Sequence, residues 1–559
     1  MKRVFITAMA TTALLWLCPN LKAQSYGGAI LDHDLMMPSD IASLSQSQIF
    51  GTARAMGMGG AFTSLGADLS SVSINPAGLG MYMHDEFSIS PMLTLSSFPT
   101  ANQNEWQSEN KTSFALSNIG FALNMIENSN SPLISLTGAF TYNRTSDYNS
   151  RLSFSNMNPF DNNVGYTPSM IDVFGQQLGS ARIFPDSEGR MSFDNNPYFW
   201  PAQLAYKGYM LDVNAAGDGW TTNTLGYNAS VLGSLDVLQR GRASEYAFAL
   251  GGNISNVLYF GASITINEIT QATEYAYQEE YLYDNGFAYA DVAAAQADVP
   301  MNYQLAYAHL SQKTTLNGAG VGLKLGLVAR PTRSLRIGVA FHTPTIYDLS
   351  RSYEATIETS VLGNYDDLLP QETFVAETDI FLDEFENSWS FSTPAVLQTG
   401  ISYQLGPIAI LSVDYERKWY NSIRVQNTPL GAEYSEQTYK ETYKSNYVPT
   451  DALRAGVEVR PIRAFALRAG AGYTSSMLGD ESLFYSSPVA TNSYYFSLGA
   501  GIRFTESSSL DLAYQNHIQN YSQYRFFYSE DSAGFITASE KFKSTLNRHY
   551  IVATFTSRF

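Results

Sequence analysis

The stretch DALRAGVEVRPIRAFALRAGAGYT, residues 451–474, contains two alternating segments joined by a short turn. In the first segment apolar residues occupy every second position, and arginine, glycine or glutamate stands between them. The second segment repeats the pattern from Phe465 onward. A strand that crosses a membrane turns its apolar side chains toward lipid and its polar side chains toward the lumen, because charges on the lipid face are costly. The stretch therefore predicts two neighbouring strands of a transmembrane β-barrel.

The composition of the 559-residue chain fits a membrane protein without membrane helices. Charged residues make up 15% and aromatic residues 13% of the chain, with 37 tyrosines, whereas about a quarter of the residues in a soluble domain are charged. Beyond the N-terminal leader the sequence has no apolar run long enough for a membrane helix, and the other structure that satisfies every backbone group in lipid is a closed barrel. The net charge of −18 argues against nucleic acid as a partner.

Applied to the whole chain, the alternation predicts an all-β fold, a transmembrane antiparallel barrel of about 14 strands. Short turns then alternate with long polar connections, as they do between the two ends of an outer-membrane barrel. The short turns are predicted at 254–257, 330–334, 405–407, 461–463 and 505–508. The strands are predicted at 86–96, 112–125, 133–144, 244–254, 257–277, 314–329, 335–357, 389–404, 408–425, 447–461, 464–477, 492–504, 509–528 and 545–559.

Residues 1–23 have the pattern of an export signal, which for a barrel predicts the outer membrane of a Gram-negative bacterium. Lys2 and Arg3 precede an apolar run, residues 4–18, that is too short to span a bilayer, and a cleavage site follows Ala23. Lipid attachment at Cys18 is the alternative, but the preceding Leu17 is large for lipoprotein processing. Cleavage after Ala23 leaves a chain without cysteine.

Residues 24–85 are predicted to lie on the periplasmic side and to fill the lumen as a hatch, ahead of the barrel at 86–559. A lumen of this width would otherwise be an open water channel. Glycine lets one backbone approach another closely, and an Asn-Pro pair followed by glycine starts a turn. The alternative is a surface linker, which the regularly spaced apolar residues disfavour. The hatch residues are Gly57, Gly59, Gly60, Asn75, Pro76, Ala77 and Gly78.

The segment GTARAMGMGGAFTSLGADLSSVSINPAGLGMY, residues 51–82, resembles the FadL/TodX family of outer-membrane transporters for long-chain fatty acids and other hydrophobic compounds. The resemblance implies a fourteen-stranded barrel closed by a hatch that includes residues 75–77. It also implies passive uptake, in which the ligand enters at an external hydrophobic groove and leaves sideways through a kinked wall. Residues 118–120 and Gly138 are candidate kinks. We expect fatty acids or other hydrophobic molecules as ligands, and a monomer surrounded by outer-membrane lipid. We expect no cofactor.

Six basic residues are predicted to face the lumen in the periplasmic halves of their strands. Two roles remain open for them. They bind the acidic head group of a ligand, which arginine does in bidentate geometry, or they pair with lumen acids and with the hatch and hold it in place. The six are Lys324, Arg336, Arg454, Arg460, Arg468 and Arg503.

The longest connection, residues 145–243, is predicted to be an extracellular loop with helices near 169–178 and 198–211. Its second helical patch is rich in large apolar side chains, which mark a candidate external hydrophobic groove. The alternative is that they pack one loop against another. The groove residues are Phe199, Trp200, Leu204 and Met210.

Nothing in the sequence favours an enzyme, a metal site or a haem receptor. The six histidines are scattered, so the pattern brings no nucleophile, histidine and acid together, and it contains no metal-ligand spacing. His342 is predicted to be a hydrogen-bonded lumen residue. Two functions remain open beside uptake: a non-transporting surface anchor or shuttle linked to protein secretion, and a general polar porin.

Overall fold

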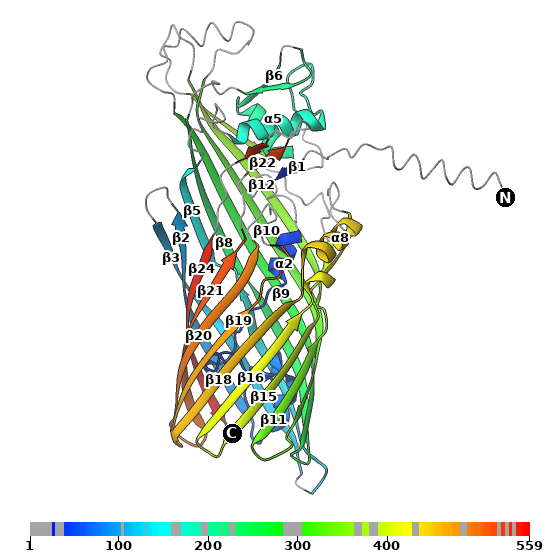
Figure 1. The fold of residues 1–559 in the computed structure, drawn as a ribbon, viewed down its shortest axis with the longest axis vertical. Coiled ribbons are helices and arrows are strands. Elements are labelled where there is room, and N and C mark those ends of the chain that lie inside the picture. The colour runs from blue at the N-terminus through cyan, green and yellow to red at the C-terminus, as the bar shows by residue number, and fades with distance from the viewer. Residues whose placement is uncertain are drawn as a thin grey trace, which may run out of the picture.

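The computed structural model describes residues 25–27, 38–101, 106–128, 130–157, 169–191, 199–214, 216–222, 230–282, 304–362, 372–378, 389–427, 435–480, 489–522, 527–530, 536–538 and 544–559. Within these residues the wall is a closed antiparallel barrel with fourteen strand positions (Figure 1). Pairing of the first wall strand with the last, Glu86 opposite Arg558, closes the cylinder. The predicted fold class and strand count are confirmed.

Some wall positions hold two strands in succession. In chain order the positions are β2 (Glu86–Ala101); β3 (Trp106–Glu127); β4 (Leu133–Asp147) with β5 (Ser150–Met157); β8 (Ser230–Ile254); β9 (Leu258–Leu282); β10 (Gln304–Ala329); β11 (Leu335–His342) with β12 (Ile346–Leu362); β14 (Trp389–Ser392) with β15 (Val396–Leu405); β16 (Ala409–Lys418) with β17 (Arg424–Gln426); β18 (Thr450–Ile462); β19 (Phe465–Thr474); β20 (Ala490–Arg503); β21 (Ser508–Tyr521); and β24 (Thr545–Arg558). A further strand, β13 (Glu372–Thr378), pairs with β12.

The five predicted short turns are confirmed. They join β8 to β9, β10 to β11, β15 to β16, β18 to β19 and β20 to β21. The C-terminus lies at the same end of the barrel, at the bottom of Figure 1. In outer-membrane barrels this end faces the periplasm and the long connections face outward. Below, the two ends are called the short-turn end and the long-loop end.

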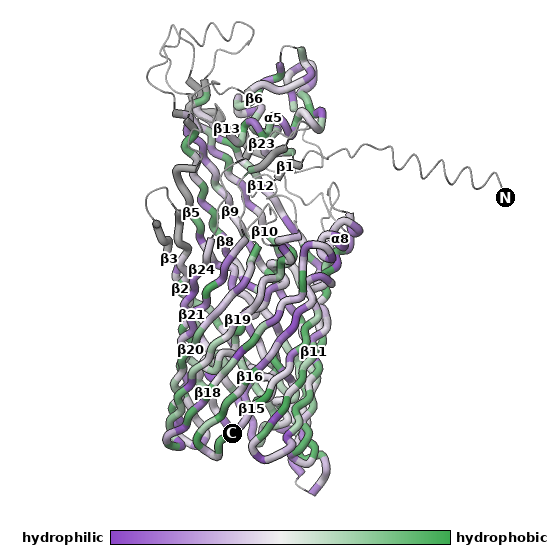
Figure 2. The backbone as a smooth tube through the Cα atoms, viewed as in Figure 1, coloured by the Kyte–Doolittle hydropathy of each residue, from purple (hydrophilic) through white to green (hydrophobic). Residues whose placement is uncertain are grey.

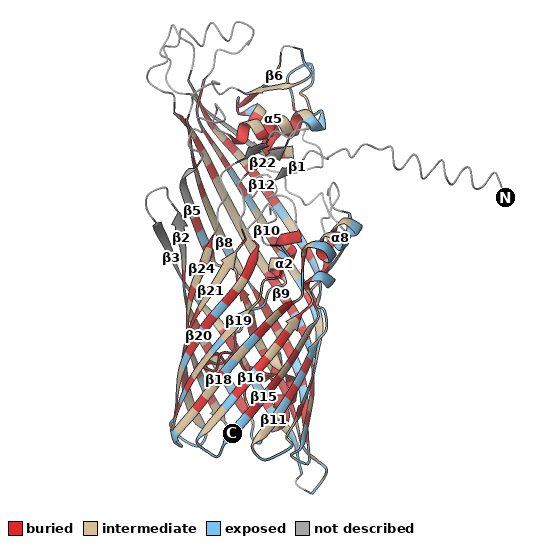
Figure 3. Cartoon of the chain, in the orientation of Figure 1, coloured by how far each residue is buried: buried red, intermediate tan, exposed pale blue. Residues whose placement is uncertain are grey.

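Side chains alternate between the two faces of the wall, as the sequence pattern predicts. On β20 the outward Tyr494, Phe496 and Leu498 are exposed, whereas Tyr495 and Ser497 between them are buried. Figure 2 shows apolar residues concentrated on the strands nearer the short-turn end, where a lipid-facing band belongs. Figure 3 shows buried and exposed residues alternating along the same strands.

Among the described helices, none is long and apolar enough to span a membrane.

Several strands continue far beyond the lipid band toward the long-loop end. β8 begins at Ser230 rather than at the predicted residue 244, and β9 and β10 are 25 and 26 residues long, whereas about 9–11 residues cross a bilayer. Two helices, α5 (Met170–Ala181) and α6 (Trp200–Lys207), share a buried core with these extensions. They lie beside a small hairpin of β6 (Leu211–Val213) and β7 (Trp220–Thr222). Both helices occur near their predicted positions.

The chain before β2 runs down the inside of the barrel. Its elements are α2 (Pro38–Leu44), α3 (Ala53–Gly57), α4 (Ser71–Ile74) and the 3-10 helix η1 (Pro76–Met81). α2 lies against α8 (Glu436–Asn446) at the long-loop end, where the Tyr443 hydroxyl donates to Pro38 O at 2.8 Å. From there the chain descends through α3, α4 and η1 to the start of β2.

The first described residues also lie at the long-loop end. β1 (Ser25–Gly27) pairs with β22 (Tyr528–Glu530), which pairs with β23 (Ile536–Ala538) in the connection between β21 and β24. The prediction that residues 24–85 lie on the periplasmic side is therefore wrong for β1 and α2, which lie at the long-loop end. The export-signal prediction falls on residues 1–23, which lie outside the described residues.

Candidate functional site

Residues 51–82, here called the hatch core, form a compact unit of short helices and turns. The Thr52 side chain caps α3. After α3 the chain turns back through Gly59 and Gly60, whose φ angles of 62° and 67° lie in the left-handed region that glycine adopts without strain. Asn75 caps η1, because its Oδ1 accepts a hydrogen bond from Ala77 N at 3.1 Å. The small residues of the sequence thus shape the turns of the hatch core.

The hatch core touches the wall where the strands carry glycine. On seven strands, a Cβ atom added to one glycine would lie within van der Waals contact distance of hatch-core backbone atoms. Because even a methyl group would occupy space already held by backbone, these glycines let wall and hatch core approach closely. They are here called the glycine belt: Gly251, Gly261, Gly326, Gly338, Gly456, Gly470 and Gly499, on β8, β9, β10, β11, β18, β19 and β20.

Asn75 joins the hatch core to two wall strands. The side chain has no exposed surface, and its Nδ2 donates to Thr63 O at 2.7 Å. The same nitrogen lies 3.3 Å from Leu327 O on β10 and 3.4 Å from Val339 O on β11. A single amide thus holds one hatch-core turn against another and both against the wall.

All seven predicted hatch residues lie within the hatch core. Two of them bond to β20: Ser497 donates to Gly57 O at 3.2 Å, and Tyr495 donates to Gly59 O at 2.7 Å. Gly60 belongs to the turn after α3, and Pro76, Ala77 and Gly78 belong to η1.

A buried ionic cluster fixes the hatch core to the other side of the barrel. Glu458 has a fully buried side chain, and its Oε2 lies 3.1 Å from Arg54 Nε of the hatch core and 2.6 Å from Arg468 Nε. Its Oε1 lies 2.5 Å from Arg460, and Arg468 also pairs with Asp511 at 2.6 Å. The cluster connects α3 with β18, β19 and β21.

Two other predicted lumen cations also have acidic partners. Lys324 Nζ lies 2.5 Å from Glu245 Oε2 and donates to Ser73 O of the hatch core at 2.9 Å. Arg454 lies 2.9 Å from Glu416.

The remaining two predicted lumen cations differ from these. Arg336 lies 3.5 Å from the Met81 sulfur, and Arg503 is exposed near the short-turn end. Within the described part of the chain neither forms an ion pair. Binding of a ligand head group by any of the six stays a prediction.

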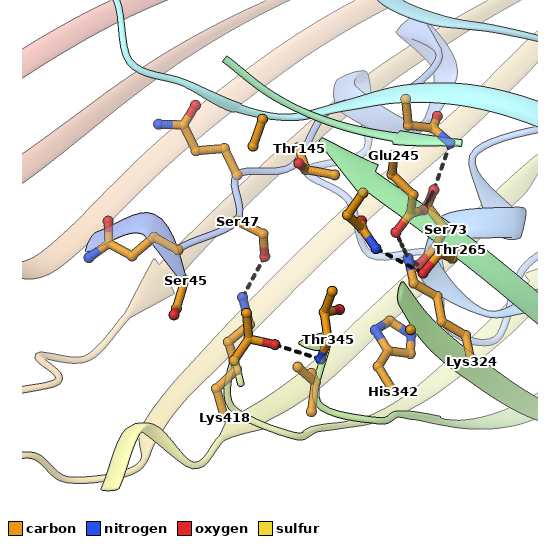
Figure 4. Close-up of a pocket in the computed structure, with 18 of the residues that line it drawn as sticks. Ser45, Ser47, Ser73, Thr145, Glu245, Thr265, Lys324, His342, Thr345 and Lys418 are labelled. Carbon is orange, nitrogen blue, oxygen red and sulfur yellow. Dashed lines mark hydrogen bonds and ion pairs between the residues drawn. The ribbon is translucent and has the colours of Figure 1, made fainter. Parts of the chain in front are cut away.

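An open cavity, here called cavity A, lies above the hatch core. Its volume is about 1160 Å³ including solvent at its open side. Hydroxyl and amide side chains are prominent in the lining, and Figure 4 shows Lys324 beside Glu245 and Ser73, and Lys418 beside Ser47. His342 Nε2 lies 3.0 Å from Ile74 O, so this histidine is hydrogen-bonded in the lumen. The charged lining residues are Arg144, Lys324, Lys418, Arg454, Glu245 and Glu416.

Residues 45–50, here called the strap, cross the lumen between α2 and the hatch core. On the other side of the strap lies cavity B, with a volume of about 750 Å³ including open solvent. Residues 46–49 line both cavities, as do Glu416, Lys418 and Arg454. The strap therefore separates two spaces that share the same charged side chains.

The wall is interrupted between β3 and β4. Their ladder ends where Asn118 pairs with Asn143, and above this point the described residues of β3 pair with β2 alone. A register shift next to Pro91 leaves Ser117 out of the ladder, and its hydroxyl donates to Gly51 O at 2.7 Å. The interruption starts beside the predicted kink at 118–120, whereas Gly138 is paired on both sides. The stretch above Asn118, where β3 is not paired with β4, is here called the wall gap.

The predicted external groove is a packed core in this structure. Trp200, Leu204 and Met210 have no exposed surface, and Phe199 is half-buried. Trp200 lies against Tyr353 of β12, with ring centroids 5.9 Å apart. These side chains are covered because α6 packs against β12, which runs to Leu362, beyond its predicted end at residue 357.

Several residues of the site escaped the sequence analysis. Glu245, Glu416 and Lys418 line cavity A beside predicted cations, and Glu416 and Lys418 lie two positions apart, in phase with the inward Asp414. The alternation along this strand therefore could have predicted that both side chains face the lumen. Ser117 gave no comparable signal, because its role depends on a register shift.

Comparison with known proteins gives a family and a fold. A family model described as outer membrane protein transport protein (OMPP1/FadL/TodX) matches residues 247–559, more than half of the chain. The crystal structure of a Pseudomonas aeruginosa FadL homologue is similar with a TM-score of 0.51 and 11% identity, covering 92% of this chain and 99% of that one. No curated protein sequence matches.

Two toluene transporters of known structure are also similar. TodX of Pseudomonas putida has a TM-score of 0.46 and 12% identity, covering 92% of this chain and 100% of that one. TbuX of Ralstonia pickettii has a TM-score of 0.44 and 14% identity, covering 91% of this chain and 98% of that one.

Proposed function

The chain belongs to the outer membrane protein transport protein family (OMPP1/FadL/TodX), and from this premise we propose that it takes up hydrophobic or amphipathic small molecules by passive diffusion. The proposed ligands resemble fatty acids, and the proposed site is cavity A. No catalytic step is proposed.

The observation that carries the proposal is a hatch core that fills the lumen beside a wall whose β3–β4 pairing is interrupted. The hatch core fills the lumen below cavity A, where Ala53, Met56, Phe62 and Leu69 have at most 1% of their surface exposed. Asn143 and Arg144, which line cavity A, stand where the β3–β4 ladder ends. A ligand in cavity A thus has a shorter way out through the wall gap than through the hatch core.

The proposed driving force is burial of apolar surface. Each methylene transferred from water to an apolar environment gains about 0.8 kcal/mol, so a long alkyl chain partitions strongly toward the membrane. β3, which borders the wall gap, carries exposed apolar side chains such as Phe114, which is 77% exposed. Four basic and two acidic side chains line cavity A, and Arg144 also pairs with the buried Asp147, so one basic side chain remains in excess. This excess favours a ligand with an acidic head group.

Mass spectrometry of small molecules retained after gentle detergent extraction tests the proposal. We expect molecules with an alkyl or aromatic body and an acidic group, displaced by added oleate, and oleate uptake by cells that depends on the protein. Recovery of a bound polypeptide without any such molecule, together with absent oleate uptake, would instead favour the surface anchor.

A further inference from the structure

Four neighbouring turns at the short-turn end of the barrel form one continuous surface. Each turn is joined to the next by a backbone hydrogen bond between the strands that leave them. Ser334 O, Ile408 O and Ala464 O accept from Gln404 N, Arg460 N and Arg503 N at 2.8, 2.6 and 2.9 Å, respectively. This surface is here called the rim arc and consists of residues 330–334, 405–408, 460–464 and 503–508.

The rim arc is basic, although the whole chain has a net charge of −18. Its one acidic residue is Glu506, against five arginines. The other connections at this end, residues 83–85, 128–132 and 255–257, contain neither arginine nor lysine. Positive charge is therefore concentrated on one side of the short-turn end. The five arginines are Arg330, Arg333, Arg460, Arg463 and Arg503.

Three of the five arginines are available to a partner. Arg460 pairs with Glu458 at 2.5 Å, and Arg330 Nη2 donates to Arg333 O at 3.0 Å within its own turn. The side chains of Arg333, Arg463 and Arg503 are exposed, and among the described residues none of these three forms an ion pair.

The same three arginines lie where the lipid-facing band ends. On β20 the exposed apolar row runs from Tyr494 to Phe504, close to the 9–11 residues that cross a bilayer. Phe504, which follows Arg503, is 61% exposed, and Ile462, which precedes Arg463, is 63% exposed. A basic side chain beside an apolar one at this border reaches the level of the lipid head groups.

We infer that the rim arc binds the phosphate groups of anionic phospholipids in the periplasmic leaflet of the outer membrane. A guanidinium group donates two parallel hydrogen bonds to a phosphate, and clusters of basic residues at a membrane surface attract anionic lipids. Side chains such as Phe504 contact the acyl chains, which a free phosphate ion or an acidic protein does not offer. The rim arc is separate from cavity A, so this inference goes beyond the proposed function and does not depend on the molecule that enters the lumen.

Native mass spectrometry of the full-length protein tests the inference. The protein is offered equal amounts of phosphatidylglycerol and of diacylglycerol with the same acyl chains. The rim triple is Arg333→Gln, Arg463→Gln and Arg503→Gln. The control triple is Arg151→Gln, Arg190→Gln and Arg240→Gln, which removes three exposed arginines toward the long-loop end. We expect the wild type and the control triple to retain phosphatidylglycerol in preference to diacylglycerol, and the rim triple to lose this preference several-fold.

Two further arms identify the source of the phosphate. Inorganic phosphate should not displace the retained lipid, and replacing the same three arginines by lysine should restore part of the preference, because the charge returns without the fork. The single variant Arg503→Gln should lower the preference as well, and it keeps the test available if the rim triple does not fold. Equal retention by the rim triple and the wild type overturns the inference and leaves an acidic protein as the partner, and complete displacement by inorganic phosphate overturns it in favour of a soluble anion.

Discussion

The strap and the hatch core follow each other in the sequence and lie in the same lumen, yet the wall holds them in different ways. The hatch core is fixed by backbone contact at the glycine belt and by the buried charges around Glu458. The strap lies between two cavities and is bonded to Lys418, and only its last residue, Phe50, packs in a buried cluster with the hatch core. Close packing needs small residues on both sides, whereas long polar side chains allow a segment to be released.

Breaking the ionic cluster should have the largest effect. Glu458→Gln leaves Arg54 and Arg468 buried without their shared carboxylate, and removing one partner of a buried ion pair costs about 3–5 kcal/mol. We expect a clear fall in the temperature at which the purified barrel loses its compact gel mobility.

The matched control is Glu268→Gln, because Glu268 forms an exposed pair with Arg242 at 4.0 Å. Such a pair contributes about 0–1 kcal/mol. Equal effects of the two substitutions would contradict a special role for the cluster.

Adding a methyl group to the belt should have the next largest effect. Gly261→Ala places a Cβ against the backbone of Pro76 and Ala77, and overpacking costs about 1–3 kcal/mol. We expect a lower unfolding temperature and leakage of ions through the displaced hatch core in planar bilayers.

Gly322→Ala on β10 is the control for the belt, because its Cβ would meet the hydroxyl oxygens of Thr345 and Thr265 at 2.8 and 3.0 Å, which can rotate away. A barrel that tolerates both substitutions equally would show that the belt glycines are not required for hatch seating.

Loss of the Asn75 amide should have a smaller effect on stability. Asn75→Ala leaves Thr63 O without its buried donor, which costs about 1–3 kcal/mol, and it removes the link to β10 and β11. Combined with Pro76→Ala, it should alter oleate uptake while the barrel remains heat-resistant on gels. Wild-type uptake by the double variant would remove this turn from the transport route.

Of the substitutions proposed here, Lys418→Met should have the smallest effect on the stability of the barrel and the largest effect on the motion of the strap. Glu416 keeps Arg454 and Gln398 as partners after the lysine is removed, whereas the strap loses its bond to β16. We expect faster amide exchange in residues 45–50 with unchanged exchange in the hatch core. Faster exchange in both regions would show that they form one mechanical unit.

Alternation along the strands was enough to predict the barrel, its short turns and the lumen phase of Arg454 and Arg468, because a strand in lipid has one face for each environment. The glycines and the Asn-Pro turn likewise predicted the hatch core. The strap and the wall gap were not predicted, since they depend on a register shift near Ser117 and on contacts such as Ser146 to Gln46 across a hundred residues. Of the two interpretations of the apolar helix, groove or packing, the structure shows packing, and the sequence did not decide between them because a helix alone does not reveal that β12 covers Trp200.

The central claim, that the hatch core seals the lumen and leaves the wall gap as the way out, is tested most directly by ion conductance of the wild-type protein in planar bilayers. We predict no steady open-pore conductance, because the hatch core packs backbone to backbone against the glycine belt. A stable conductance proportional to voltage, like that of an open porin, would contradict the seal.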